Sequence, residues 1–162
     1  MRKLVRRKFK AALAALAFLS LAAGAAGALT VAAGLPAAFA AEAELSGADR
    51  AAIERTIRGQ IEAFGRDDAA AAFAFAAPAI REMFGTPENF LGMVRNGYAA
   101  VYRPREVEFR ALVTVAEIVV QQVLVVGPDG RAQIALYTME RQADGTWRIN
   151  GCSLVASPEK AI

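Results

Sequence analysis

Apolar side chains have helical spacing in the segment that begins at residue 46. These side chains recur every three or four positions, at Ile53, Ile57, Ile61 and Phe64. They therefore fall on one side of a helix, while charged residues occupy the other sides. Ser46 can cap the start of this helix and Gly65 can end it. The pattern predicts an amphipathic helix with one buried face.

Two further helices are predicted before residue 100. The carboxylates of Asp67 and Asp68 suit the start of a helix over residues 69–77, because they accept hydrogen bonds from free backbone N–H groups and oppose the helix dipole. Pro78 breaks or restarts this helix. Thr86 followed by Pro87 resembles a cap with proline in the first turn, so a third helix should run towards Tyr98.

After Pro104 the apolar pattern changes to the period of two that is typical of strands. Strands are predicted over residues 107–113, 118–126, 131–141 and 146–155. Residues 127–130 (Gly-Pro-Asp-Gly) and 143–145 (Ala-Asp-Gly) predict hairpin turns, and Gly151 predicts a bulge. About three helices followed by about four antiparallel strands give an α+β fold, in which the sheet must curve around the helices to bury both apolar surfaces.

Several polar side chains interrupt the predicted strands: Gln121, Gln122, Gln133, Arg148 and Asn150. Successive residues of a strand point to opposite faces, so the adjacent glutamines must lie one on each face. An antiparallel sheet can leave one face in water. We interpret these residues as a solvated convex face, the alternative being that the face binds something.

The first forty residues resemble an export signal. Six basic residues and no acidic residue precede a charge-free run over residues 11–40, which ends in Ala38-Phe39-Ala40, a pattern that signal peptidase cleaves. Arg6-Arg7 resembles the twin-arginine motif, although the flanking residues depart from it, so both export routes stay open. An uncleaved membrane anchor is the other interpretation. We expect cleavage after Ala40 and a periplasmic or secreted protein without a stable membrane anchor.

Cleavage changes the charge of the protein. The whole chain carries 19 basic and 16 acidic residues, a net charge of +3. Six of the basic residues lie in the predicted signal, so the mature part keeps 13 basic and 16 acidic residues, a net charge of −3. The basic excess that would suggest nucleic-acid binding therefore leaves with the signal. We expect no nucleic-acid partner.

The residue types exclude the commonest catalytic designs. The chain contains no histidine and one cysteine, Cys152. Histidine-dependent nucleophile systems, His-ligated metals and internal disulfides are therefore impossible. No dinucleotide, triphosphate or dithiol motif occurs. We expect neither a metal nor a cofactor.

Several strings in the mature chain together resemble the bacterial family called domain of unknown function 4864. They include residues 57–64, 73–85, 101–104, 136–141 and 144–152. That family in turn resembles the NTF2-like or SnoaL-like cone, in which helices fill a curved sheet and leave a pocket at its wide end. The resemblance implies such a domain over residues 49–155, between a short segment over 41–48 and a tail over 156–162. It brings no activity with it.

Five residues form the candidate site: Tyr98, Tyr102, Arg103, Tyr137 and Glu140. Aromatic rings with polar tips and a guanidinium suit a small organic or anionic ligand. We therefore predict a non-catalytic module that binds a small ligand or an envelope protein. One alternative is a cofactor-free isomerase or dehydratase that uses Glu140 with Tyr137 or Tyr102. Another alternative is a homodimer formed across open sheet faces.

Overall fold

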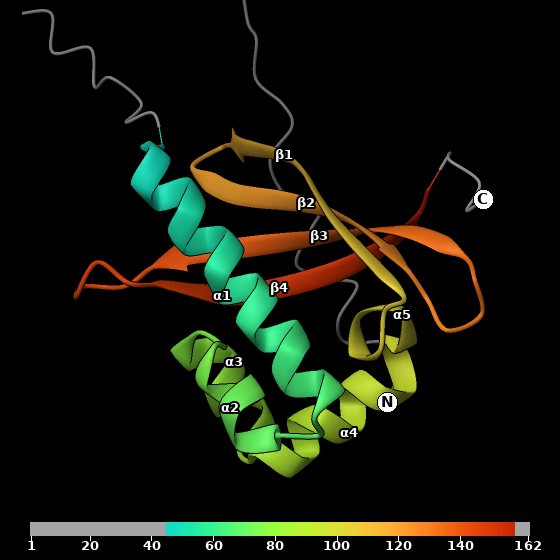
Figure 1. Cartoon of the computed structure of the whole chain (residues 1–162). Coiled ribbons are helices and arrows are strands. Elements are labelled where there is room, and N and C mark those ends of the chain that lie inside the picture. Colours follow the sequence, from blue (N-terminus) through green and yellow to red (C-terminus); the bar gives the residue numbers. More distant parts are fainter. Residues whose placement is uncertain (1–44, 158–162) are drawn as a thin grey trace, which may run out of the picture. The chain divides into compact units, whose positions relative to one another are not determined.

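The computed structural model describes residues 45–157, so the predicted signal peptide lies outside the described residues. Five helices precede four strands in this part of the chain (Figure 1). The elements are α1 (Gly47–Gly65), α2 (Ala69–Ala74), α3 (Pro78–Phe84), α4 (Pro87–Gly97), α5 (Ala99–Tyr102), β1 (Glu106–Val115), β2 (Ile118–Val126), β3 (Ala132–Arg141) and β4 (Trp147–Ala156). The predicted α+β class is confirmed, and the arrangement is consistent with an NTF2-like cone.

The predicted count of about three helices is too low for residues 45–157, because two predicted helices are divided. Pro78 begins α3 rather than continuing α2, and Ala76 forms a bridge to Ile149 of β4 between the two helices. Tyr98 leaves the helical region of backbone space, with φ −134° and ψ 44°, so α5 is separate from α4. These interruptions turn the chain around one end of the sheet.

The capped amphipathic helix predicted at the start of the domain is α1. Ser46 and Asp49 form a reciprocal capping box at its first turn. The predicted apolar stripe is buried, with Ile53 and Ile57 fully inaccessible to solvent. Oδ1 of Asp49 also accepts a 3.0 Å hydrogen bond from Nε1 of Trp147, which fastens the start of α1 to the start of β4.

The four strands form one antiparallel sheet in the order β1-β2-β3-β4. Both predicted hairpin turns are confirmed, with Gly130 and Gly145 at φ 78° and 81°. The β1–β2 turn was not predicted. It consists of Ala116 and Glu117, at φ 47° and 65°, a backbone that normally selects Gly or Asn. No residue type in the sequence therefore marked this turn.

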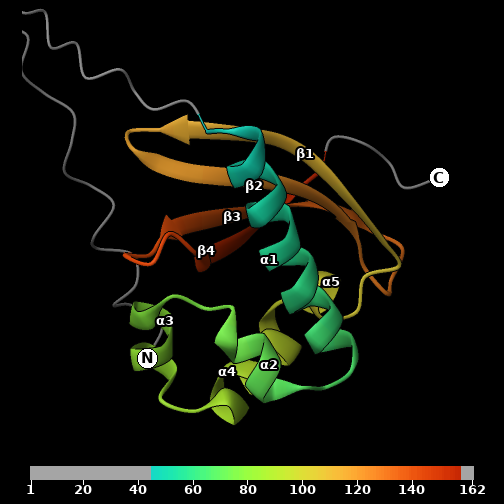
Figure 2. The same cartoon turned by 60° about the vertical axis from the view of Figure 1, so that its left-hand side comes forward.

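The helices lie on one side of the curved sheet. Figures 1 and 2 show α1 crossing this side, with the other helices gathered near one end. We call this side the inner face. Buried side chains alternate along it, as at Val119, Val123, Ala135 and Tyr137. The residues between them point to the opposite side, which we call the outer face.

Two bulges change which residues face the helices. In β1 the register shifts between Phe109 and Leu112, and in β4 it shifts opposite Thr138 and Met139, beside Gly151, where a bulge was predicted. A Cβ atom at Gly151 would lie 2.7 Å from Oγ1 of Thr138, so a larger residue would displace the Thr138 side chain or the strand that carries it.

Gln121 corrects the interpretation that the polar strand residues form a solvated face. It is 2% exposed and lies on the inner face. Its side-chain amide donates to the carbonyl oxygens of Arg110 and Ala111, at 3.0 and 3.3 Å. The β1 bulge removes these carbonyls from the regular ladder, so Gln121 supplies the hydrogen bonds that the bulge needs.

Among residues 45–157, each helix is too short or too polar to cross a membrane.

Candidate functional site

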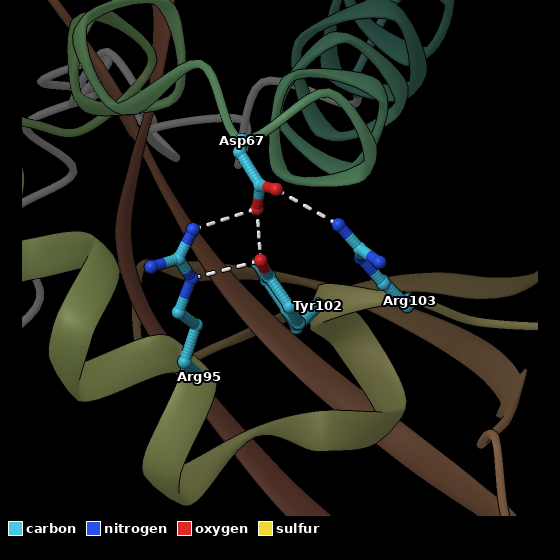
Figure 3. A network of polar contacts seen from close by, with 4 residues as sticks. All are labelled: Asp67, Arg95, Tyr102 and Arg103. Carbon is cyan, nitrogen blue, oxygen red and sulfur yellow. Dashed lines mark hydrogen bonds and ion pairs between the residues drawn. The ribbon is translucent and has the colours of Figure 1, made fainter.

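Four polar side chains converge beside the loop between α1 and α2. We call this group the Asp67 cluster; it consists of Asp67, Arg95, Tyr102 and Arg103. Figure 3 shows the carboxylate of Asp67 facing the three other side chains. Asp67 comes from the loop, Arg95 from α4, and Tyr102 with Arg103 from the end of α5. The cluster therefore joins three segments that are distant in the sequence.

Both carboxylate oxygens of Asp67 are hydrogen-bonded. Nη2 of Arg95 lies 2.8 Å from Oδ1, and Nη2 of Arg103 lies 2.8 Å from Oδ2. The Tyr102 hydroxyl also donates to Oδ1 and accepts a 2.8 Å hydrogen bond from Nε of Arg95. The two guanidinium carbons lie 5.4 and 5.2 Å from the centre of the Tyr102 ring, which places both cations against an aromatic surface.

The backbone of Asp67 explains why its carboxylate reaches the cluster. α1 ends at Gly65, and Asp67 then adopts a positive φ of 58°, which aspartate tolerates better than most residues. The next residue, Asp68, accepts a 2.9 Å hydrogen bond from the N–H of Ala71 and caps α2. The prediction that the acidic pair starts a helix is therefore confirmed for Asp68, whereas Asp67 serves the cluster instead.

The cluster is ionised and lies at the surface. Hydrogen bonds from Tyr102 and Arg95 lower the pKa of Asp67, and the hydrogen bond to Asp67 raises the pKa of Arg95. One carboxylate faces two guanidinium groups, so the cluster carries one excess positive charge. The side chains of Arg95, Arg103 and Asp67 are 47%, 55% and 40% exposed. A carboxylate with a lowered pKa is a weak base, so this arrangement favours anion binding over proton abstraction.

A second polar group lies between α5 and the inner face. The Tyr98 hydroxyl donates a 3.2 Å hydrogen bond to the backbone carbonyl of Cys152. Tyr137 pairs with Cys152 across β3 and β4 and is fully buried. Among the described residues, no group meets the geometry of a hydrogen bond to the Tyr137 hydroxyl, although the Cys152 thiol lies close enough to affect its pKa.

Burial keeps both inner-face groups neutral. Desolvation raises the pKa of Tyr137 well above its usual value, and it raises the pKa of the Cys152 thiol to about 12. Desolvation also raises the pKa of Tyr98, which is less deeply buried. A neutral thiol is a poor nucleophile, so Cys152 behaves as a buried small residue.

The five predicted site residues occupy three places. Tyr102 and Arg103 meet in the Asp67 cluster, whereas Tyr98 and Tyr137 each lie against Cys152. Glu140 lies three residues after Tyr137 on β3 and therefore on the outer face, opposite Arg148 of β4. Its carboxylate accepts a 3.0 Å hydrogen bond from Gln142. The structure does not bring Glu140 together with Tyr137.

Sequence reasoning missed two members of the Asp67 cluster. In the sequence, Asp67 is interpreted as a helix cap in preference to a site residue, although a helix start needs one side-chain acceptor and the sequence offers two adjacent acids. Arg95 stands on the polar side of α4 like many exposed arginines, and no sequence signal pointed to it. Within residues 45–157, no group of three or more potential metal-binding His, Cys, Asp or Glu side chains occurs.

Comparison with known proteins identifies the family of this chain. The curated proteins and the solved structures include no significant match. Residues 46–162, which contain every described helix and strand, match the family described as Domain of unknown function (DUF4864). The chain thus belongs to the DUF4864 family, as the strings in its sequence predicted.

Proposed function

We propose that this protein is a non-catalytic binding module that acts after export, in the periplasm or outside the cell, and that the Asp67 cluster binds a small organic anion. The observation that supports this proposal most strongly is that the half-exposed guanidinium groups of Arg95 and Arg103 both contact the carboxylate of Asp67, which leaves one positive charge in excess. Carboxylate and phosphate groups are the ligands that arginine recognises best, because its N–H groups form a planar fork.

The arginines have hydrogen-bonding capacity beyond Asp67. Arg103 reaches Asp67 through Nη2, and Arg95 uses Nη2 for Asp67 and Nε for Tyr102. A guanidinium group carries five N–H donors. An incoming carboxylate can therefore bind donors that Asp67 and Tyr102 do not use. The hydrogen bonds to Asp67 hold both guanidinium groups in place beforehand, which lowers the entropy lost on binding.

The geometry of the site argues against acid-base catalysis. Tyr102 and Asp67 are hydrogen-bonded to each other, and the pKa of Asp67 is lowered, which suits a fixed ion pair rather than a general base. Glu140, the base of the predicted isomerase or dehydratase, lies on the outer face of β3, away from Tyr137. A binding role therefore uses the observed geometry more fully than acid-base catalysis does.

A calorimetric titration at low salt tests the proposal. The purified protein is titrated with mono-, di- and tricarboxylates and with inorganic phosphate. We expect at least one anion to bind, and Arg103→Gln to weaken its binding at least about fivefold, since one charge-assisted contact is lost. Arg55→Gln is the matched control, because Arg55 is an exposed arginine on α1 outside the cluster. The proposal would be contradicted if no anion of the panel bound, or if Arg103→Gln and Arg55→Gln lost the same amount of affinity.

A further inference from the structure

The outer face of the sheet is unusually apolar. Five large apolar side chains among the described residues are conspicuously exposed, and four of them lie on this face: Val113 (37%), Val115 (61%), Ile118 (51%) and Val155 (44%). The fifth is Met83 of α3, at 73%. Exposed apolar side chains gathered on one face mark an interaction surface, whereas scattered ones need no explanation.

The half-buried residues of the outer face extend the apolar surface across all four strands. The β2 residues Val120 and Leu124 pair with Thr138 and Ile134 of β3, and Ile134 in turn pairs with Val155 of β4. A strand of an antiparallel sheet with one solvated face should alternate apolar and polar residues. β2 instead carries apolar residues on both faces, which is the pattern of a strand that is covered on both sides.

The charges on the outer face lie mainly on the edge strands of the sheet and include both signs. Glu108 and Arg110 form a 3.0 Å ion pair on the edge strand β1, which also carries the exposed Glu106. Glu140 of β3 lies opposite Arg148 of β4, whose guanidinium donates to the carbonyl oxygen of Ala74 in α2. The other polar residues of this face, Gln122, Thr138 and Ser153, are uncharged. Because charges of both signs are present, the face does not strongly repel a second copy of itself, and its mainly apolar central strands β2 and β3 between charged edge strands resemble the core and rim of a dimer interface.

The size of the outer face suits a dimer. Four strands about 4.8 Å apart and about ten residues long, at about 3.4 Å per residue, cover roughly 600 Å² as a plane. Side-chain relief increases the accessible area, which brings it near the roughly 800 Å² that each partner buries in a standard interface. None of the described helices covers this face in Figures 1 and 2.

From the apolar rows, the balanced charges and the area, we infer that the outer face binds a second copy of this chain, in a twofold dimer with the two sheets face to face. The Asp67 cluster belongs to the loop and helices around the inner face. The dimer therefore leaves both anion sites accessible, and this inference does not depend on the proposed function.

Sedimentation velocity of the purified protein over roughly 1 to 100 µM, the range in which an interface of this size should associate, tests the inference. We expect twice the chain mass at the upper concentrations. Val113→Lys on β1 and Val155→Lys on β4 should each yield the monomer, because each substitution buries one lysine charge from each copy in an apolar interface. Met83→Lys is the control, since it adds the same charge at an exposed apolar residue of α3 and should leave the dimer intact.

Two results would overturn the inference. The first is a wild-type protein that stays monomeric at every concentration, which would also be the result if the outer face were covered by another segment of the chain. The second is a dimer that persists in both lysine variants. Circular dichroism identifies any variant that fails to fold, and the wild-type measurement alone remains decisive in that case.

Discussion

Nη2 of Arg103 lies 2.8 Å from Oδ2 of Asp67, across 36 positions of the sequence. The contact ties the end of α5 to the loop after α1, and Arg95 ties α4 to the same carboxylate. A single aspartate therefore organises the polar surface at this end of the domain.

Asp67 should make the stability of the protein sensitive to acid. The pKa of its carboxyl is lower in the folded protein than its usual value of 3.8. Its contribution is therefore present above pH 3.8 and is lost as the pH falls through the lower folded pKa. The melting temperatures of the wild type and Asp67→Asn should differ near neutral pH and converge in strong acid. A difference that stays constant down to about pH 2 would contradict the assigned hydrogen bonds.

Gln121→Leu should destabilise the protein by about 1 to 3 kcal/mol, because the carbonyls of Arg110 and Ala111 lose their side-chain donor. Urea unfolding measures the effect. Gln133→Leu is the matched control, since Gln133 is half-buried on β3, and it should change stability by less than about 0.5 kcal/mol. Equal effects of the two substitutions would show that the bulge does not depend on Gln121.

Tyr137→Phe should leave stability unchanged or increase it. The substitution removes a fully buried hydroxyl that has no hydrogen-bond partner among the described residues. Tyr98→Phe removes a hydroxyl that donates to Cys152 and should destabilise the protein by about 0.5 to 1.5 kcal/mol. If Tyr137→Phe proves the more destabilising of the two in thermal unfolding, the Tyr137 hydroxyl must have a partner in solution.

Cys152 should make the protein less stable in alkali. The pKa of its thiol is about 12 in the folded protein against a usual value of 9.0, so the unfolded chain loses this proton first as the pH rises above 9. Each pH unit between these values favours unfolding by about 1.4 kcal/mol. Wild type should therefore lose about 2 kcal/mol more than Cys152→Ala between about pH 9 and pH 11. If chemical denaturation showed that wild type and Cys152→Ala lose the same stability over this pH range, the burial of the Cys152 thiol would be contradicted.

Much of the fold was predictable because local chemistry specifies it. The capping box at Ser46, the stripe at Ile53 and the glycines at 130 and 145 each fit one backbone geometry, and each appears where predicted. The Ala116-Glu117 turn was not predictable in this way, because neither residue prefers the positive φ that the strand pairing imposes.

The Asp67 cluster was only partly predictable. Tyr102 and Arg103 were candidates because an aromatic ring and a guanidinium stand side by side in the sequence. Their partners Asp67 and Arg95 come from other segments, and only the packing of α4 against α2 and of α5 against α1 brings them together. Similarly, Glu140 is a candidate in the sequence because it is an acid at the end of a predicted strand, but the pairing of β3 with β4 places it on the outer face.

The most direct measurement is the affinity of Asp67→Asn for the organic anion that binds best to the wild type. Asparagine tolerates the same positive φ and keeps one acceptor oxygen, while the positive excess of the cluster rises from one charge to two. If the cluster is the binding site, Asp67→Asn should bind the anion about three- to fivefold more tightly and Arg103→Gln more weakly. Unchanged affinity in both variants would contradict the account.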